Sequence, residues 1–103
     1  MRLPVEFDGK TLFVRTPLTM TRARAVVEAG LPLLKGGEVV VDLAQVTEAD
    51  SSAIAVLLAW QREQRSRSGS LRVQNAPAGL RSIAHAYGAE GEIDGISLPA
   101  GSA

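Results

Sequence analysis

EVVVDLAQVTEADSSAIAVLLAW, residues 38–60, is the stretch that decides the fold. Glu38–Leu43 holds three consecutive valines, a β-branched run that is apolar on both faces and so predicts a strand in the middle of a sheet. After a polar turn, a helix is expected from about Ser51 to Arg67, where Ser68-Gly69-Ser70 ends it. A central strand that leads into a helix is typical of an α/β domain.

Upstream of this stretch, the sequence predicts a hairpin and a first helix. Val5–Phe7 and Leu12–Arg15 are short extended runs joined by residues 8–10, Asp-Gly-Lys, and Asp-Gly between apolar runs is a strong hairpin signal. From Thr19 onward, apolar residues recur at the spacing of an amphipathic helix. Pro32 near its end predicts a kink or an early stop.

Downstream, Leu71–Val73 predicts a further strand, and the segment from Pro77 to Gly88 predicts a third helix. Ile96–Leu98 would add a last short strand. The alternation predicts a mixed sheet of four or five strands with right-handed crossovers, an antiparallel N-terminal hairpin and about three helices. We expect one domain over residues 1–98 and a flexible tail over residues 99–103.

Composition excludes several classes of protein. The 103 residues include eleven basic and eleven acidic side chains, so no net charge attracts nucleic acid. There is no cysteine for disulfides or thiolate metal sites. The longest apolar run, Ala53–Trp60, is far shorter than the roughly 20 residues of a membrane span, and the N-terminus lacks a secretory signal pattern. These observations predict a cytoplasmic protein that does not insert into a membrane.

The run Ala53–Trp60 is apolar over more than two helical turns, so it cannot confine its apolar side chains to one stripe facing a sheet. A neighbouring helix of the same domain would cover the remaining side chains. Alternatively, a partner protein would cover them, because exposed apolar patches usually mark interfaces. Both explanations can hold at different turns.

The candidate functional residues are Asp50, Ser51 and Ser52, at the junction between the central strand and the second helix. Asp and Ser are favoured helix N-caps, which explains one of the three. A cluster of three at the carboxyl end of a central strand also lies where α/β sheets place their sites. The hydroxyls of Ser51 and Ser52 are candidates for phosphorylation, although the phosphate would lie close to Asp50.

Residues 39–54, VVVDLAQVTEADSSAI, resemble the signature of the STAS family: a central strand, Asp-Leu, a short loop, and Asp-Ser-Ser before a helix. The remaining elements agree in order from the first hairpin to the third helix. STAS domains are small α/β modules of anti-sigma-factor antagonists, of the tails of anion transporters, and of the bacterial Mla phospholipid-transport ABC system, in which the STAS protein is a free-standing subunit.

Three features make the chain more similar to the transporter subunit than to the antagonists. They are Ala53-Ile54 after the serines, where antagonists usually carry Gly-Leu, the run Leu57–Trp60, and Pro77 with Leu80 and Tyr87. The chain also ends soon after Leu98, whereas antagonists generally continue into a further helix. One departure is Ser51, since the transporter subunit often has Thr there; the hydroxyl is kept and the methyl group is lost.

The resemblance implies a non-catalytic subunit, peripheral at the inner face of the inner membrane, that binds the ATPase of the transporter and regulates or stabilises it. The binding residues would be Asp50, Ser51 and Ser52. The loop before the first helix leaves the neighbouring strand at the same sheet end, so we expect it beside them. Its contact residues would be Thr16, Leu18 and Thr19.

Two other hypotheses stay open. The first is an anti-sigma-factor antagonist switched by phosphorylation, with Ser52 as the first candidate. The second is a small enzyme or ligand-binding domain that uses the same crevice. No motif supports catalysis, a nucleotide, a cofactor or a metal: His85 is the only histidine, and no Gly-rich loop with phosphate-binding spacing follows a strand. Tyr87 is interpreted as a residue at the edge of the core.

Overall fold

The computed structural model describes residues 3–97. Its strands and helices alternate after an initial hairpin, as the sequence predicts. The elements are β1 (Val5–Phe7), β2 (Thr11–Val14), α1 (Ala23–Gly30), a 3-10 turn (Leu31–Leu33), β3 (Glu38–Asp42), α2 (Ser52–Ser66), β4 (Ser70–Gln74) and α3 (Ala78–Ala86).

The four strands form one mixed sheet in the order β1-β2-β3-β4. β1 and β2 are antiparallel, with Val5 opposite Val14, and their turn places Gly9 at a positive φ of 101°. β3 lies between β2 and β4 and is parallel to both. The predicted mixed α/β fold with an antiparallel N-terminal hairpin is therefore confirmed, and the three-valine strand lies inside the sheet.

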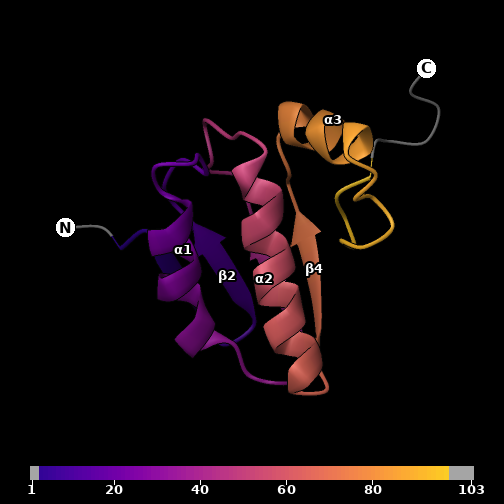
Figure 1. The fold of residues 1–103 in the computed structure, drawn as a ribbon. Coiled ribbons are helices and arrows are strands. Elements are labelled where there is room, and N and C mark those ends of the chain that lie inside the picture. Colours follow the sequence, from indigo (N-terminus) through magenta and orange to yellow (C-terminus); the bar gives the residue numbers. More distant parts are fainter. Residues whose placement is uncertain (1–2, 98–103) are drawn as a thin grey trace.

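α1 and α2 lie side by side across one face of the sheet, while α3 sits at the end where β3 and β4 finish (Figure 1). The core lies between this helical layer and the sheet, where alternate strand residues point inward. Leu12, Val41 and Val73 come from three neighbouring strands and are at most 3% exposed. The sheet end that carries the candidate residues is thus built on a fully packed core.

Trp60 on α2 explains how the long apolar run is covered. Its side chain is 0% exposed, and its Nε1 donates a hydrogen bond to the Val27 carbonyl of α1 at 3.2 Å. Gly30 lets the two helices approach, because a Cβ there would lie 2.5 Å from the Trp60 ring. Beyond Gly30 the chain tightens into the 3-10 turn that contains Pro32, so the predicted early stop is confirmed. Ala55, by contrast, remains exposed.

Two predictions near the C-terminus need correction. Ile96 and Ser97 form no strand; instead Asp94 makes an isolated parallel bridge to Arg72 of β4, because Gly95, at φ 91°, turns the chain away. Tyr87 is 66% exposed, since α3 ends at Ala86 and the ring leaves the core-facing stripe. Leu98 and the predicted tail lie outside the described residues.

Candidate functional site

Two loops meet at the carboxyl end of the sheet, one before α1 and one before α2. The Leu18 amide donates to the Glu48 carbonyl at 2.9 Å, and the Asp50 amide donates to the Leu18 carbonyl at 3.1 Å. Leu18 and Ala49 thereby form an isolated parallel bridge. The structure thus places the loop from Thr16 to Thr19 beside Asp50, Ser51 and Ser52.

The Asp50 carboxylate fixes both loops at once. Its Oδ1 accepts hydrogen bonds from the Ser52 amide at 2.8 Å and from the Ser52 hydroxyl. Its Oδ2 accepts from the Met20 amide at 2.9 Å. Asp50 therefore acts as the side-chain cap of α2, in contact with the amide two residues ahead, and ties the start of α1 to the same point.

These contacts also change the acidity of Asp50. The Ser52 hydroxyl, followed by the Met20 and Ser52 amides, lowers the pKa of its carboxyl below the ordinary value of 3.8. Hydrogen bonds to a carboxylate favour the charged form. The ionised form of Asp50 is therefore the one that holds the two loops together.

The free energy of unfolding should depend on the Asp50 carboxylate at acidic pH. A folded-state pKa below the unfolded value contributes stability that is present above the unfolded pKa and is lost as pH falls through the folded one. We expect Asp50→Asn to flatten the rise of unfolding free energy between about pH 2 and pH 5, measured by denaturant unfolding. An unchanged slope would show that Asp50 carries no such role. Asp8, whose pKa the Thr11 amide lowers, supplies a remaining slope in both proteins.

The two serines have different surroundings. The Ser52 hydroxyl is half-buried and donates to Asp50, so it belongs to the internal bonding of the junction. Ser51 is exposed, and its side chain makes no capping hydrogen bond. Ser51 is thus the more accessible of the two hydroxyls.

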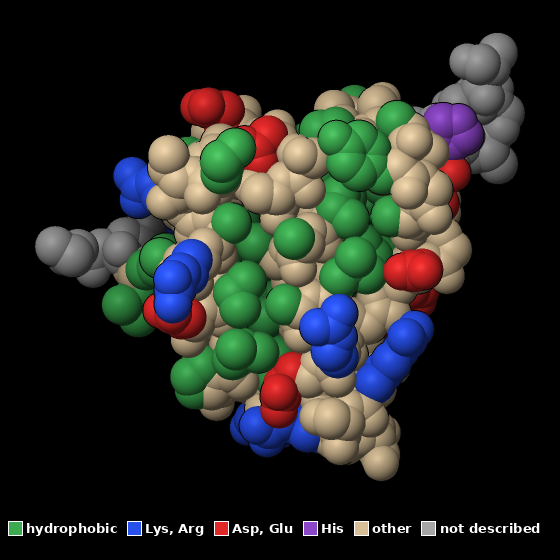
Figure 2. All heavy atoms as spheres, viewed as in Figure 1, with side chains coloured by type: hydrophobic (Ala, Val, Ile, Leu, Met, Phe, Trp, Pro, Cys, Tyr) green, Lys and Arg blue, Asp and Glu red, His purple; other side chains and the backbone are tan. Residues whose placement is uncertain are grey.

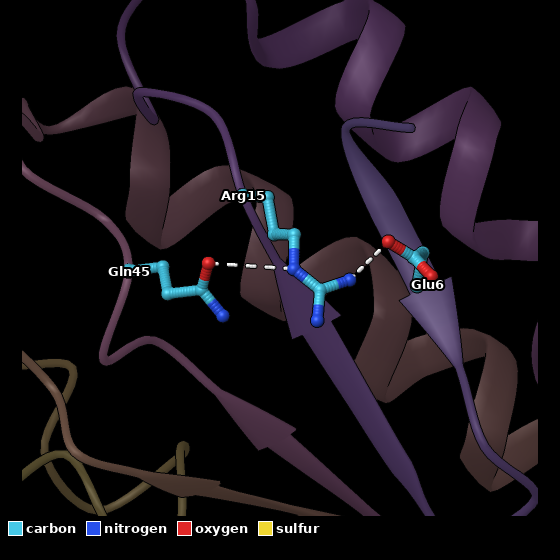
Figure 3. A network of polar contacts seen from close by, with 3 residues as sticks. All are labelled: Glu6, Arg15 and Gln45. Atoms are coloured by element: carbon cyan, nitrogen blue, oxygen red, sulfur yellow. Dashed lines mark hydrogen bonds and ion pairs between the residues drawn. The ribbon is translucent and has the colours of Figure 1, made fainter. Parts of the chain in front are cut away.

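On the face of the sheet opposite the helices, Arg15 contacts the loop before α2 (Figure 3). Its Nε donates to Gln45 Oε1 at 3.3 Å, and its Nη1 contacts Glu6 of β1. The guanidinium also lies 5.4 Å from the centre of the Phe13 ring. Together these contacts link the edge strand β1, the end of β2 and the loop that leads to Asp50. They hold this loop in place, in addition to the hydrogen bonds of Asp50 itself.

At the surface, the loop before α1 presents a residue that the sequence analysis missed. Met20 is 78% exposed, directly beside the Asp50 carboxylate that its amide contacts. Thr16 and Leu18, by contrast, are 7% and 0% exposed. We therefore correct their assignment: they support the loop from inside, whereas Thr19 is half-buried and Met20 is accessible. No periodicity marks Met20, since it lies outside the helical stripe.

Figure 2 shows that hydrophobic side chains gather over α1, α2 and α3 on the helical face. The half-buried hydrophobic residues of these helices include Val27, Leu58 and Ile83, and Tyr87, directly after α3, is exposed. Apolar area of this kind on a small domain is typical of an interaction surface.

Within residues 3–97, no group of three His, Asp or Glu side chains is placed to hold a metal ion. In the same part of the chain, no helix combines the length and the apolar character that crossing a membrane requires. The site consists of exposed loop residues on a rigid support.

Solved structures share this architecture. A putative anti-sigma factor antagonist from Thermotoga maritima matches with a TM-score of 0.69 and 12% identity, covering 88% of this chain and 82% of its own. The anti-sigma factor antagonist SpoIIAA in its unphosphorylated form matches with a TM-score of 0.66 and 14% identity, covering 86% and 83%. These likenesses show the fold.

A third structure places the same fold inside a larger protein. The murine anion transporter Slc26a9 matches with a TM-score of 0.63 and 15% identity, over 73% of this chain but only 13% of the transporter. No curated protein matched the chain.

A family model described as "Mlab, STAS domain" matches residues 1–98. The match includes the hairpin, the central strand and the Asp-Ser-Ser junction, the same elements that build the site. STAS domains are generally regulatory and non-catalytic. The chain therefore belongs to the STAS domain family, in its MlaB-like branch.

Proposed function

We propose that this chain is a non-catalytic subunit that binds the ATPase of an ABC-type phospholipid transporter and regulates or stabilises it. The observation that carries the proposal is the exposure of Ser51 and Met20 on two loops that one carboxylate, that of Asp50, holds together. A pre-formed surface of this kind binds with a smaller ordering cost than flexible loops would. The MlaB-like family assignment supports a transporter partner.

The chemistry of the surface fits a protein partner. Met20 offers an adaptable apolar side chain, and such side chains suit protein contacts. Ser51 and Thr19 add hydroxyls at its border, and the two loops are fixed by backbone bonds. We name Ser51, Met20 and Thr19 as contact residues, and Asp50, Ser52, Thr16 and Leu18 as the residues that hold them in place.

The regulatory effect would follow from mass action. A subunit that binds only the assembled, folded ATPase stabilises that form by RT ln(1 + L/Kd), where L is the free concentration of the subunit and Kd is its dissociation constant. No contact with lipid or ATP is required. The domain would thus work at the cytoplasmic side of the inner membrane, through its partner.

The second candidate is an anti-sigma-factor antagonist that phosphorylation switches. The accessible hydroxyl of Ser51 favours it, as does the likeness to antagonist folds. The hydrogen bond of the Ser52 hydroxyl to Asp50 supports Ser51, in place of Ser52, as the residue that would be modified. A phosphate on Ser51 would add negative charge beside that carboxylate.

Affinity purification of the tagged, full-length chain from its native cell separates the two functions. We expect an ABC ATPase and a membrane permease to co-purify with the wild type, and the Ser51→Arg variant to recover neither. A control variant, Ser66→Arg, places the same side chain on an exposed position at the far end of α2 and should recover both. Recovery of a sigma-factor-regulating kinase instead would contradict the transporter function.

A further inference from the structure

A second candidate site lies along the C-terminal half of α2, toward the end of the helix remote from Asp50. Residues of α2 spaced three and four apart face the segment that follows α3, and between them is a surface hollow of about 150 Å³. Figure 2 shows Lys and Arg side chains beside acidic ones over this part of the helical face. The lining residues are Leu58, Gln61, Arg62, Arg65 and Glu92.

The first observation that indicates a ligand is the side-chain amide of Gln61. Gln61 is only 8% exposed, yet its Oε1 has no hydrogen-bond partner within residues 3–97. Buried polar atoms are nearly always paired, so an orphan acceptor at a hollow needs an explanation. Gln64 Oε1 is unpaired as well, but Gln64 does not line the hollow, and its Nε2 donates to the Gly37 and Ser70 carbonyls at 3.0 Å, which joins the end of α2 to the segment before β3 and to the start of β4. Gln61 makes no such structural bond.

The charges around the hollow are the second sign. Arg62 and Arg65 are exposed and form no ion pair with any described residue, and Glu92, across the hollow, forms none either. The neighbouring Arg67 behaves otherwise, since its Nε binds Glu63 at 2.7 Å. The hollow therefore offers two guanidinium donors together with an amide and a carboxylate acceptor.

We propose that this hollow binds a small phosphorylated polyol. Guanidinium groups bind phosphate oxygens with paired, charge-assisted hydrogen bonds, which Arg62 and Arg65 can supply. Hydroxyl groups of the ligand would donate to Gln61 Oε1 and to Glu92. A bare anion would leave both acceptors unpaired. The same chemistry occurs in a soluble polyol phosphate and in the headgroup of a glycerophospholipid.

Calorimetric titration of the full chain with glycerol 3-phosphate tests the site. We expect saturable binding that is at least tenfold tighter than that of inorganic phosphate, and that Arg62→Gln/Arg65→Gln weakens at least tenfold. Arg67→Gln is the matched control, because it removes an arginine from the same helix end without touching the hollow. Equal affinity for both probes, or an unchanged affinity in the double variant, would overturn the proposal.

Flotation with lipid vesicles distinguishes a lipid headgroup from a soluble polyol phosphate as the ligand. Binding to phosphatidylcholine vesicles that contain phosphatidylglycerol, but not to pure phosphatidylcholine, would assign the site to a lipid headgroup. Binding to glycerol 3-phosphate alone would assign it to a soluble ligand. Absence of binding to either would refute the site.

Gln61→Met gives a readout that a purely structural glutamine would not produce. The substitution keeps the volume and removes the unpaired acceptor, so the melting temperature should rise by about 4 °C or more. Glycerol 3-phosphate should bind at least tenfold more weakly. A lower melting temperature, or unchanged binding, would mean that the amide serves the fold and not a ligand.

Discussion

Replacing Trp60 with alanine is expected to lower the free energy of unfolding by about 3–5 kcal/mol. Trp60 is the largest of the fully buried side chains, and it joins the two helices of the helical layer. Truncation would leave a cavity against Gly30 that helix backbone cannot collapse to fill, and it would leave the Val27 carbonyl without its indole partner. Domains of this size are stable by only about 5–15 kcal/mol, so the loss is a large fraction of the total.

Urea unfolding followed by circular dichroism measures this effect. Tryptophan fluorescence is unsuitable, because Trp60 is the only tryptophan of the chain. Tyr87→Ala is the matched control: its ring is 66% exposed, so the expected change is within about 0.5 kcal/mol. A Trp60→Ala protein within about 1 kcal/mol of the wild type would refute the packing described here.

Ser51→Arg is expected to weaken binding to the ATPase partner by at least about 2 kcal/mol, or roughly thirtyfold in the dissociation constant. The new side chain would project from the docking surface beside Met20 and bring a long charge into a contact built from a small hydroxyl and an apolar chain. Its effect on the fold should be small, since Ser51 is exposed and its side chain makes no capping bond. Docking and stability are therefore separable at this position.

At Asp50, in contrast to Ser51, the effects of a substitution on docking and on stability are not separable. Its carboxylate contacts Ser52 and Met20 and is part of the support, so a substitution there changes the shape of both loops as well as the surface. A loss of binding in Asp50→Asn cannot by itself be credited to a lost contact with the partner.

Most of the architecture could be predicted because each element has a local signal. Asp8-Gly9 marks the hairpin, Pro32 marks the end of the first helix, and Pro77 precedes α3, which begins at Ala78. The bridge of Asp94 to Arg72 has no such signal, because it depends on a turn at Gly95 that no periodicity announces. Tyr87 was misassigned because helical spacing continues through it, whereas the helix itself ends at Ala86.

The candidate site was predictable in position but not in detail. Adjacent strands that end at the same sheet edge bring the two loops together, which topology alone implies. Which side chains face the solvent depends on backbone bonding, such as the pairing of Leu18 with Ala49 that buries Leu18 and leaves Met20 outside. Which of Ser51 and Ser52 has the accessible hydroxyl likewise depends on which of them donates a hydrogen bond to the Asp50 carboxylate.

The measurement that tests the central claim most directly is calorimetric titration of the purified ATPase partner with the full chain, its Ser51→Arg variant and its Ser66→Arg control. Our account predicts tight binding by the wild type and the control, a loss of roughly thirtyfold or more in Ser51→Arg, and similar melting temperatures for all three. Binding of the Ser51→Arg protein with wild-type affinity would contradict docking at this junction.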